Sequence, residues 1–258
     1  MKKTKVMTLM ATTTLGALAL VPMSALAVDG GEYQTNGAIQ FAPNTNPTNP
    51  VDPTNPVDPT NPDPDKPITP VDPTDPTGPK PGTAGPLSID YASSLSFGEQ
   101  TITSKNMTYY AETQKYKDNA GADQEGPNFV QVSDNRGTET GWTLKVKQNG
   151  QFKTEANQEL TAAKVTLSNG RVVSASQSAK PTTAPATIEL NPTGAESVVM
   201  AAGDKEGAGT YLMSWGDSVD AAKTSISLEV PGSTTKYAKK YTTTFTWTLT
   251  DTPANTGN

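Results

Sequence analysis

Residues 236–253 read KYAKKYTTTFTWTLTDTP and carry the clearest structural signal in the chain. From Tyr241 to Thr250, aromatic and apolar side chains alternate with threonines. A period of two in residues of high β propensity predicts a strand with one apolar face, which must pack against another layer. Pro253 cannot donate a ladder hydrogen bond, so the strand is expected to end there.

The same short pattern occurs far upstream, at Trp142-Thr143-Leu144. Trp142 and Leu144 share one face of the predicted strand, and Thr143, Lys145 and Lys147 share the other. A domain of this size has one main core, which both apolar faces must share. We therefore expect the two Trp-x-Leu strands to be neighbours in one sheet or to face each other across a sandwich.

The rest of the chain from Leu87 onward predicts many short strands separated by turn residues. Asn149-Gly150 between two alternating runs predicts a hairpin that returns at Gln151-Phe152. Residues 160–167 fit either a short helix or a strand, and the polar residues 112–128 indicate a loop. No convincing amphipathic helix is present. The fold class expected is all-β, as a sandwich or a barrel in a single domain.

Residues 43–86 are of low complexity, and from Pro47 to Pro62 every third residue is proline. This spacing matches the three residues per turn of a polyproline II helix. The segment has almost nothing to bury, so we expect a spacer that does not pack as part of a core. The alternative is a ligand for proline-binding modules.

Residues 28–42 precede the proline-rich segment and contain Ile39 and Phe41 in alternation with small or polar neighbours. This alternation predicts a strand at Gly37–Phe41 that belongs to the main domain. The proline-rich segment would then leave the domain and return to it as a long excursion, whose closure entropy grows only slowly with length.

The first residues have the composition of a secretory signal peptide. Lys2, Lys3 and Lys5 precede an apolar run, and residues 25–27 supply small residues for cleavage. The alternative is a membrane anchor, but the apolar run is short and Pro22 interrupts its end. We expect residues 1–27 to be removed, leaving a mature chain without a membrane span.

The composition argues against most enzymatic chemistry. The chain has no cysteine, hence neither a disulfide nor a thiolate, and no histidine, the commonest general base and metal ligand. Its net charge of −6 disfavours nucleic acid as a partner. Acidic pairs such as Glu155 and Glu159 lie in polar stretches typical of a solvated surface. We expect no enzyme, no catalytic residue, no cofactor and no metal site.

Taken together, the two Trp-x-Leu contexts resemble a known family. The distal copy, YTTTFTWTLTDTP, and the proximal copy, VSDNRGTETGWTLKVKQNGQF, are similar to the two motifs of WxL-domain surface proteins of Gram-positive bacteria. The resemblance implies a WxL β domain at 87–258 with a first strand in 28–42. It also implies an extracellular protein attached non-covalently to the cell wall, chiefly to peptidoglycan, alongside companion surface proteins.

Seven residues are candidates for wall or partner binding: Trp142, Leu144, Lys145, Lys147, Tyr241, Trp247 and Leu249. Each indole either belongs to the core or lies exposed and stacks on a sugar ring or a partner. The lysines either add affinity for anionic wall polymers or keep sheet edges soluble.

Two functions from different classes therefore remain. One is a wall-binding module; the other is an interaction subunit that binds companion wall proteins or host ligands rather than peptidoglycan. Thr252 precedes Pro253 where a sortase signal requires leucine. We therefore expect retention through the folded surface rather than through a covalent anchor.

Overall fold

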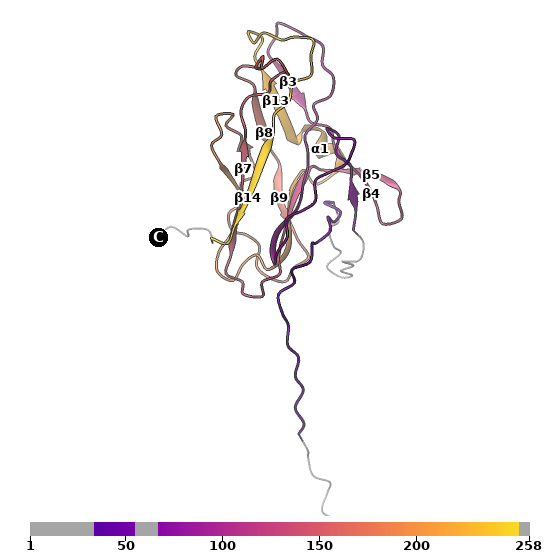
Figure 1. The fold of residues 1–258 in the computed structure, drawn as a ribbon, viewed down its shortest axis with the longest axis vertical. Coiled ribbons are helices and arrows are strands. Elements are labelled where there is room, and N and C mark those ends of the chain that lie inside the picture. The colour runs from indigo at the N-terminus through magenta and orange to yellow at the C-terminus, as the bar shows by residue number, and fades with distance from the viewer. Residues whose placement is uncertain (1–33, 55–66, 253–258) are drawn as a thin grey trace, which may run out of the picture. The chain divides into compact units, whose positions relative to one another are not determined.

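The computed structural model describes residues 34–54 and 67–252, in two units divided after Gln40 (Figure 1). The predicted signal peptide lies outside the described residues. The prediction of a strand at Gly37–Phe41 is wrong, because these residues form no strand. The side chains of Ile39 and Phe41 are 79% and 84% exposed. Alternation alone does not make a strand; a neighbouring strand and a covering layer must also be present.

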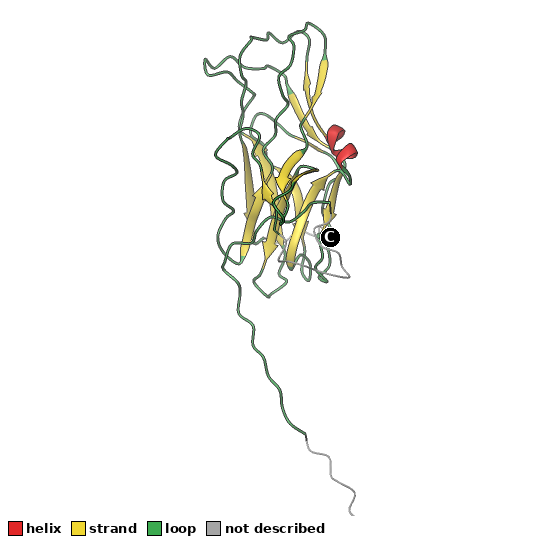
Figure 2. Cartoon of the chain, turned by 90° about the vertical axis from the view of Figure 1, so that its right-hand side faces the viewer, coloured by secondary structure: helices red, strands yellow, loops and turns green. Residues whose placement is uncertain are grey.

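In the second unit, residues 41–258, the described regular structure consists of strands and one short helix, joined by loops (Figure 2). Its described strands form four antiparallel sheets, which do not close into a barrel, and this confirms the predicted all-β, sandwich-like class. The short helix α1 (Val219–Ser225) begins at Ser218, whose hydroxyl accepts a hydrogen bond from the Ala221 amide at 3.2 Å.

A four-stranded sheet forms the centre of the unit. Its order is β2 (Leu87–Ala92), β6 (Phe129–Asp134), β12 (Gly209–Trp215) and β9 (Gly170–Val173). Alternate residues of β6 belong to two different clusters: Val130 to the main core and Phe129 to a second, smaller one. Because both faces of this sheet are apolar, each face must be covered by another layer.

One covering layer is the sheet in the order β11 (Ser197–Ala202), β7 (Trp142–Gln148) and β14 (Phe245–Thr250). Figure 1 shows β7 and β14 side by side, and they pair antiparallel. The expectation that the two Trp-x-Leu strands are neighbours in one sheet is confirmed. The distal strand is shorter than predicted, because it begins only at Phe245 and Thr242 forms an isolated bridge to Lys153.

The hairpin predicted at Asn149-Gly150 is not formed. Both edges of β7 are occupied by strands from distant parts of the sequence, β11 and β14. After the turn, Phe152 enters the core instead, with its ring centroid 6.0 Å from that of Phe97.

A further sheet extends the main core, in the order β10 (Ile188–Glu189), β8 (Lys164–Leu167), β13 (Ile226–Val230) and β3 (Met107–Tyr110). Strand β8 resolves the ambiguity of residues 160–167 in favour of a strand. Its residues Val165 and Leu167 are buried in the main core.

The last sheet has the order β1 (Thr69–Pro70), β4 (Gln114–Lys117) and β5 (Asp123–Gly126). The prediction of a loop for residues 112–128 is therefore wrong. The Asp118 carboxylate accepts hydrogen bonds from the Ala120 and Ala122 amides, both at 2.9 Å, and so stabilises a turn between β4 and β5.

The described part of the proline-rich segment does pack against the domain, contrary to prediction. Ile68 is buried and Val51 half-buried against the second cluster, on the outward face of the central sheet. Proline-rich chain has few apolar side chains of its own. Val51 and Ile68 instead pack against apolar side chains that are distant in the sequence, and composition does not reveal this surface.

Candidate functional site

Strand β7 divides its candidate residues between two faces. Trp142 and Leu144 are completely buried and belong to the main core. Lys145 and Lys147 are half-buried and project from the opposite face, as strand alternation requires. The core interpretation therefore holds for Trp142, whose indole presents no ring face for stacking on a sugar.

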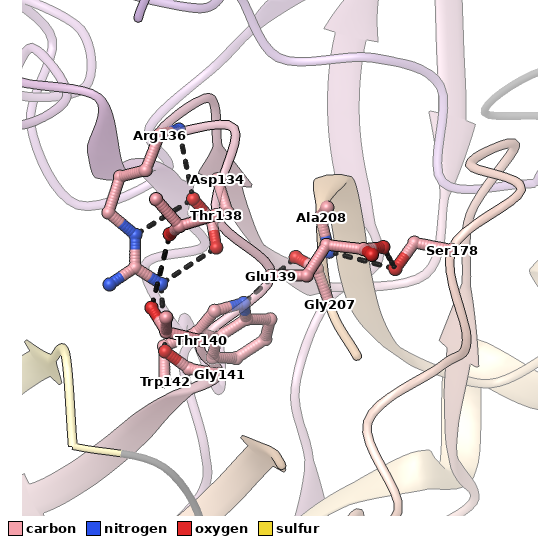
Figure 3. Close-up of polar contacts among 10 residues, drawn as sticks. All are labelled: Asp134, Arg136, Thr138, Glu139, Thr140, Gly141, Trp142, Ser178, Gly207 and Ala208. Atoms are coloured by element: carbon pink, nitrogen blue, oxygen red, sulfur yellow. Dashed lines mark hydrogen bonds and ion pairs between the residues drawn. The ribbon is translucent and has the colours of Figure 1, made fainter. Parts of the chain in front are cut away.

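The Trp142 indole is held in place by a specific polar contact. Its Nε1–H donates to the Gly207 carbonyl at 2.9 Å (Figure 3), and its ring centroid lies 6.3 Å from that of Tyr211. Gly207 has a φ of +77°, and a Cβ there would lie only 2.6 Å from Trp142 Nε1. A side chain at residue 207 is thus incompatible with the position of the indole.

A charged clamp precedes Trp142 in the turn that resembles the family motif. Arg136 forms a bidentate pair with Asp134: Nε donates to Oδ1 at 2.9 Å and Nη2 donates to Oδ2 at 2.7 Å (Figure 3). The same Nη2 also donates to the Gly141 carbonyl at 2.7 Å. The hydrogen bond to Asp134 raises the pKa of Arg136. This bidentate pair fixes the backbone immediately before Trp142.

Trp247 and Leu249 occupy the equivalent face of β14. Trp247 lies opposite Val146 and Leu249 opposite Leu144, so both Trp-x-Leu motifs point into the same core. The two residues are half-buried, and the Trp247 ring centroid lies 6.1 Å from that of Trp215. Trp247 therefore packs against the core but lies on the edge strand of its sheet.

Tyr241 lies before β14 rather than in it. The tyrosine is half-buried against the main core, and its hydroxyl accepts a hydrogen bond from the Tyr237 amide at 2.9 Å. This contact closes the turn that leads into the strand. The position of Tyr241 favours a structural role, in contrast to the binding role expected for it.

The outward face of β7 and β14 is polar and charged. Thr246, Thr248 and Thr250 lie opposite Lys147, Lys145 and Thr143 in the register, so lysines and threonines share one face. Lys145 forms an ion pair with Glu196 at 3.2 Å, with 38% and 41% of the two side chains exposed. Within the described ranges, Lys147 has no ion-pair partner. We call this surface the lysine–threonine face.

The structure thus separates the sequence-predicted candidates into two groups. Trp142, Leu144, Trp247 and Leu249 organise the core, whereas Lys145 and Lys147 lie on the lysine–threonine face. Sequence reasoning missed Arg136 and Gly207, which position Trp142. The signal for Arg136 was the turn composition and Asp134 two residues before it, whereas Gly207 gave no signal because Trp142 lies 65 residues away in the sequence.

Neither a metal centre nor a membrane-spanning helix is found in the described part of the chain. No cluster of three acidic residues in these ranges has the geometry to hold a metal ion. Among the same residues, no helix has the length and apolar character needed to cross a bilayer.

Comparison with known proteins gives one match. A family model described as "WxL domain surface cell wall-binding" matches residues 28–253, which is most of the chain. The matched region begins directly after the predicted signal peptide and includes both Trp-x-Leu strands. No curated protein and no solved structure shows significant similarity.

Proposed function

The chain belongs to the family of WxL-domain surface proteins that bind the cell wall, and we propose that it attaches non-covalently to peptidoglycan through its lysine–threonine face. Membership of this family implies a location at the cell surface. The finer proposal concerns which wall component is bound and which surface of the domain binds it.

The observation that carries this proposal is the orientation of the two motif strands. Trp142 and Leu144 are buried, so the motif itself does not present rings to the wall. The same two strands place Lys145 and Lys147 beside a row of threonines on the opposite face. A rigid core under a polar face holds those side chains at fixed spacing, which favours recognition of a repeating polymer.

The chemistry of the face fits peptidoglycan. The stem peptides of peptidoglycan carry carboxylates, and its sugars carry hydroxyl and acetamido groups. Lysine ammonium groups bind carboxylates, and threonine hydroxyls both donate and accept hydrogen bonds. Because the chain is acidic overall, local lysines must provide the attraction to anionic groups.

The test is sedimentation of the mature chain with purified sacculi from which protein and teichoic acid have been removed. We expect the double variant Lys145→Gln/Lys147→Gln to bind at least tenfold more weakly, because both ammonium groups are lost. Both lysines are half-buried at the surface, so the thermal midpoint should change little.

The matched control is Lys105→Gln/Lys115→Gln, which removes the same charge at two exposed lysines away from β7 and β14. This variant should bind like the wild type. If both double variants bind equally, or if the wild-type chain does not sediment with stripped sacculi, direct binding of peptidoglycan through this face is wrong.

A second candidate function rests on the edge of the same sheet. Within the described sheet, β14 pairs with β7 on one side only, and its other edge is available to an added strand. A companion surface protein that adds a strand there would make the chain an interaction subunit. Purified companion ectodomains should then bind with unchanged affinity when Lys145 and Lys147 are replaced.

A further inference from the structure

The outward face of the central sheet holds part of the proline-rich segment. We call residues 47–54 and 67–72 the proline strap. Its Val51 and Ile68 pack on an apolar cluster formed by Tyr91, Tyr116, Phe129, Leu212 and Val173. The two parts of the strap are also joined, because the Ile68 amide donates to the Pro50 carbonyl at 2.9 Å.

A buried glutamine of β6 recognises the backbone of the strap. Gln131 Oε1 accepts from the Val51 amide, and Gln131 Nε2 donates to the Asn49 carbonyl, both at 2.9 Å. The two contacts lie on either side of Pro50, which has no N–H of its own to satisfy. Gln131 is completely buried, so these backbone groups replace the water that its amide would otherwise bind.

A second buried group fixes the orientation of that glutamine. Asp90 Oδ2 accepts from Gln131 Nε2 at 2.9 Å and from the Ser133 hydroxyl at 2.7 Å, while Oδ1 accepts from the Ser88 hydroxyl at 2.7 Å. A carboxylate and an amide buried together are costly unless their hydrogen bonds are satisfied. This network therefore forms a built site for an extended peptide backbone.

The strap residues in this site form a locally ordered unit. The Thr54 amide and hydroxyl donate to Asp52 Oδ1 at 2.8 and 2.7 Å, and the Asp72–Thr74 turn repeats this arrangement at 2.7 Å for both bonds. Turns of this kind form within a few residues and need no distant partner. A peptide of this sequence is thus partly preorganised for binding.

The same hexapeptide occurs more than once in the chain. Asn-Pro-Val-Asp-Pro-Thr stands at 49–54 and again, without change, at 55–60. The site contacts backbone atoms, the valine and, through Tyr116, the side chains of Asp52 and Thr54, all of which an identical copy of the repeat supplies. The recognition does not depend on which chain the repeat comes from.

We infer that this face of β2 and β6 is a binding site for a proline-rich Asn-Pro-Val-Asp-Pro-Thr peptide. Residues 49–54 fill the site within the chain, and the same repeat from a second copy of the protein fills it when the internal one is absent. A tethered repeat has a high effective concentration, so exchange between copies requires crowding or a weakened internal repeat. This interaction is independent of wall binding.

The test uses a mature chain in which residues 49–60 are replaced by a Gly-Ser repeat of equal length, which removes both identical copies. A fluorescent peptide with the sequence of residues 47–54 is titrated into this opened chain and followed by anisotropy. We expect saturable binding to the opened chain and at least tenfold weaker binding to the wild type, whose own repeat fills the site.

The peptide itself supplies the matched controls. N-methylation of its valine removes the N–H that Gln131 accepts and should weaken binding at least tenfold. N-methylation at the threonine equivalent to Thr48 should have little effect. A peptide with Val and Asp exchanged keeps every proline and should not bind. Equal binding of all these peptides, or no binding to a folded opened chain, overturns the inference.

If the opened chain does not fold, a milder variant replaces it. Val51→Asp/Val57→Asp weakens both repeats and keeps every proline. This chain should bind the unmodified peptide and reject the N-methyl-valine peptide. Failure to bind the unmodified peptide at millimolar concentration would contradict the proposed site.

Discussion

At the scale of single residues, two buried polar contacts position the most important side chains. The indole of Trp142 donates to the Gly207 carbonyl, and the carboxylate of Asp90 accepts three hydrogen bonds inside the domain. Neither contact involves a partner of opposite charge. Both depend on close packing, since an unsatisfied buried polar group costs on the order of 1–3 kcal/mol.

Gly207→Ala should destabilise the fold more than its backbone conformation alone explains. A Cβ at residue 207 would lie 2.6 Å from both Trp142 Nε1 and Ala202 Cβ. Gly137→Ala is the matched control, because its φ of +73° is similar but a Cβ would meet nothing within 4 Å. Urea unfolding should show that Gly207→Ala costs about 1–3 kcal/mol more than the control. Equal costs would contradict the described packing around Trp142.

Asp90 should make the domain less stable as the pH rises. Burial raises the pKa of Asp90, and its hydrogen bonds to Ser88, Ser133 and Gln131 only partly oppose this. The folded state therefore holds this proton more tightly than the unfolded state. Its stabilising contribution is complete below the unfolded pKa near 3.8 and is lost as the pH rises through the raised folded pKa.

Asp90→Asn tests this pH dependence. The difference in unfolding free energy, wild type minus variant, should fall as the pH rises from about 3.5 toward neutrality. Asp75→Asn should show the opposite slope, because hydrogen bonds from Thr77 lower the pKa of Asp75. If the Asp90→Asn difference does not change with pH, the carboxyl group is not buried as described.

At the scale of elements, the proline strap and the motif strands cover opposite faces of the same central sheet. The strap has the composition of a spacer, yet Ile68 is 6% exposed whereas Val71, three residues later, is 44% exposed. The strand β1 also pairs Thr69 and Pro70 with β4. The strap is thus a layer of the fold, attached by a small number of buried side chains.

Ile68→Ala should therefore destabilise the domain by about 2–4 kcal/mol, as expected for removing a buried isoleucine side chain. Val71→Ala is the control from the same strap and should cost much less, about 0.5 kcal/mol, because the valine is 44% exposed and belongs to neither buried cluster. Chemical denaturation of the mature chain measures both. A cost for Ile68→Ala as small as that of the control would mean that the strap is only loosely associated.

At the scale of the whole molecule, the two apolar clusters share one sheet. All three tryptophans of the chain, Trp142, Trp215 and Trp247, belong to or pack against the main cluster, and Tyr91 and Tyr116 belong to the second. Strands β2, β6 and β12 contribute residues to both clusters. Unfolding of one cluster therefore exposes apolar side chains of the other. The strap and the sandwich are expected to unfold together.

Urea unfolding should accordingly give one transition. Tryptophan fluorescence reports the main cluster. Because Tyr211 also belongs to the main cluster, the second cluster is followed by the part of the near-ultraviolet circular dichroism that is lost in a Tyr91→Phe variant. The two curves should coincide, as they do for a two-state domain. An earlier transition in the tyrosine signal would show that the strap detaches before the sandwich unfolds.

The sequence by itself determined the all-β class, the two Trp-x-Leu strands and their shared core. Alternation over Tyr241–Thr250 and Trp142–Lys147 identifies which side chains share a face, and one domain core leaves those faces few alternatives. These features depend on neighbours along the chain, and a sequence displays such neighbours directly.

Only the tertiary structure decided what covers each face. The burial of Trp142 depends on Gly207, and the docking of Val51 depends on Gln131, eighty residues away along the chain. The apolar alternation at Gly37–Phe41 finds no such cover among the described residues, while the polar residues 112–128 acquire two strands. Periodicity specifies a face, but burial depends on a partner brought near by folding, and the pattern within one segment does not encode that partner.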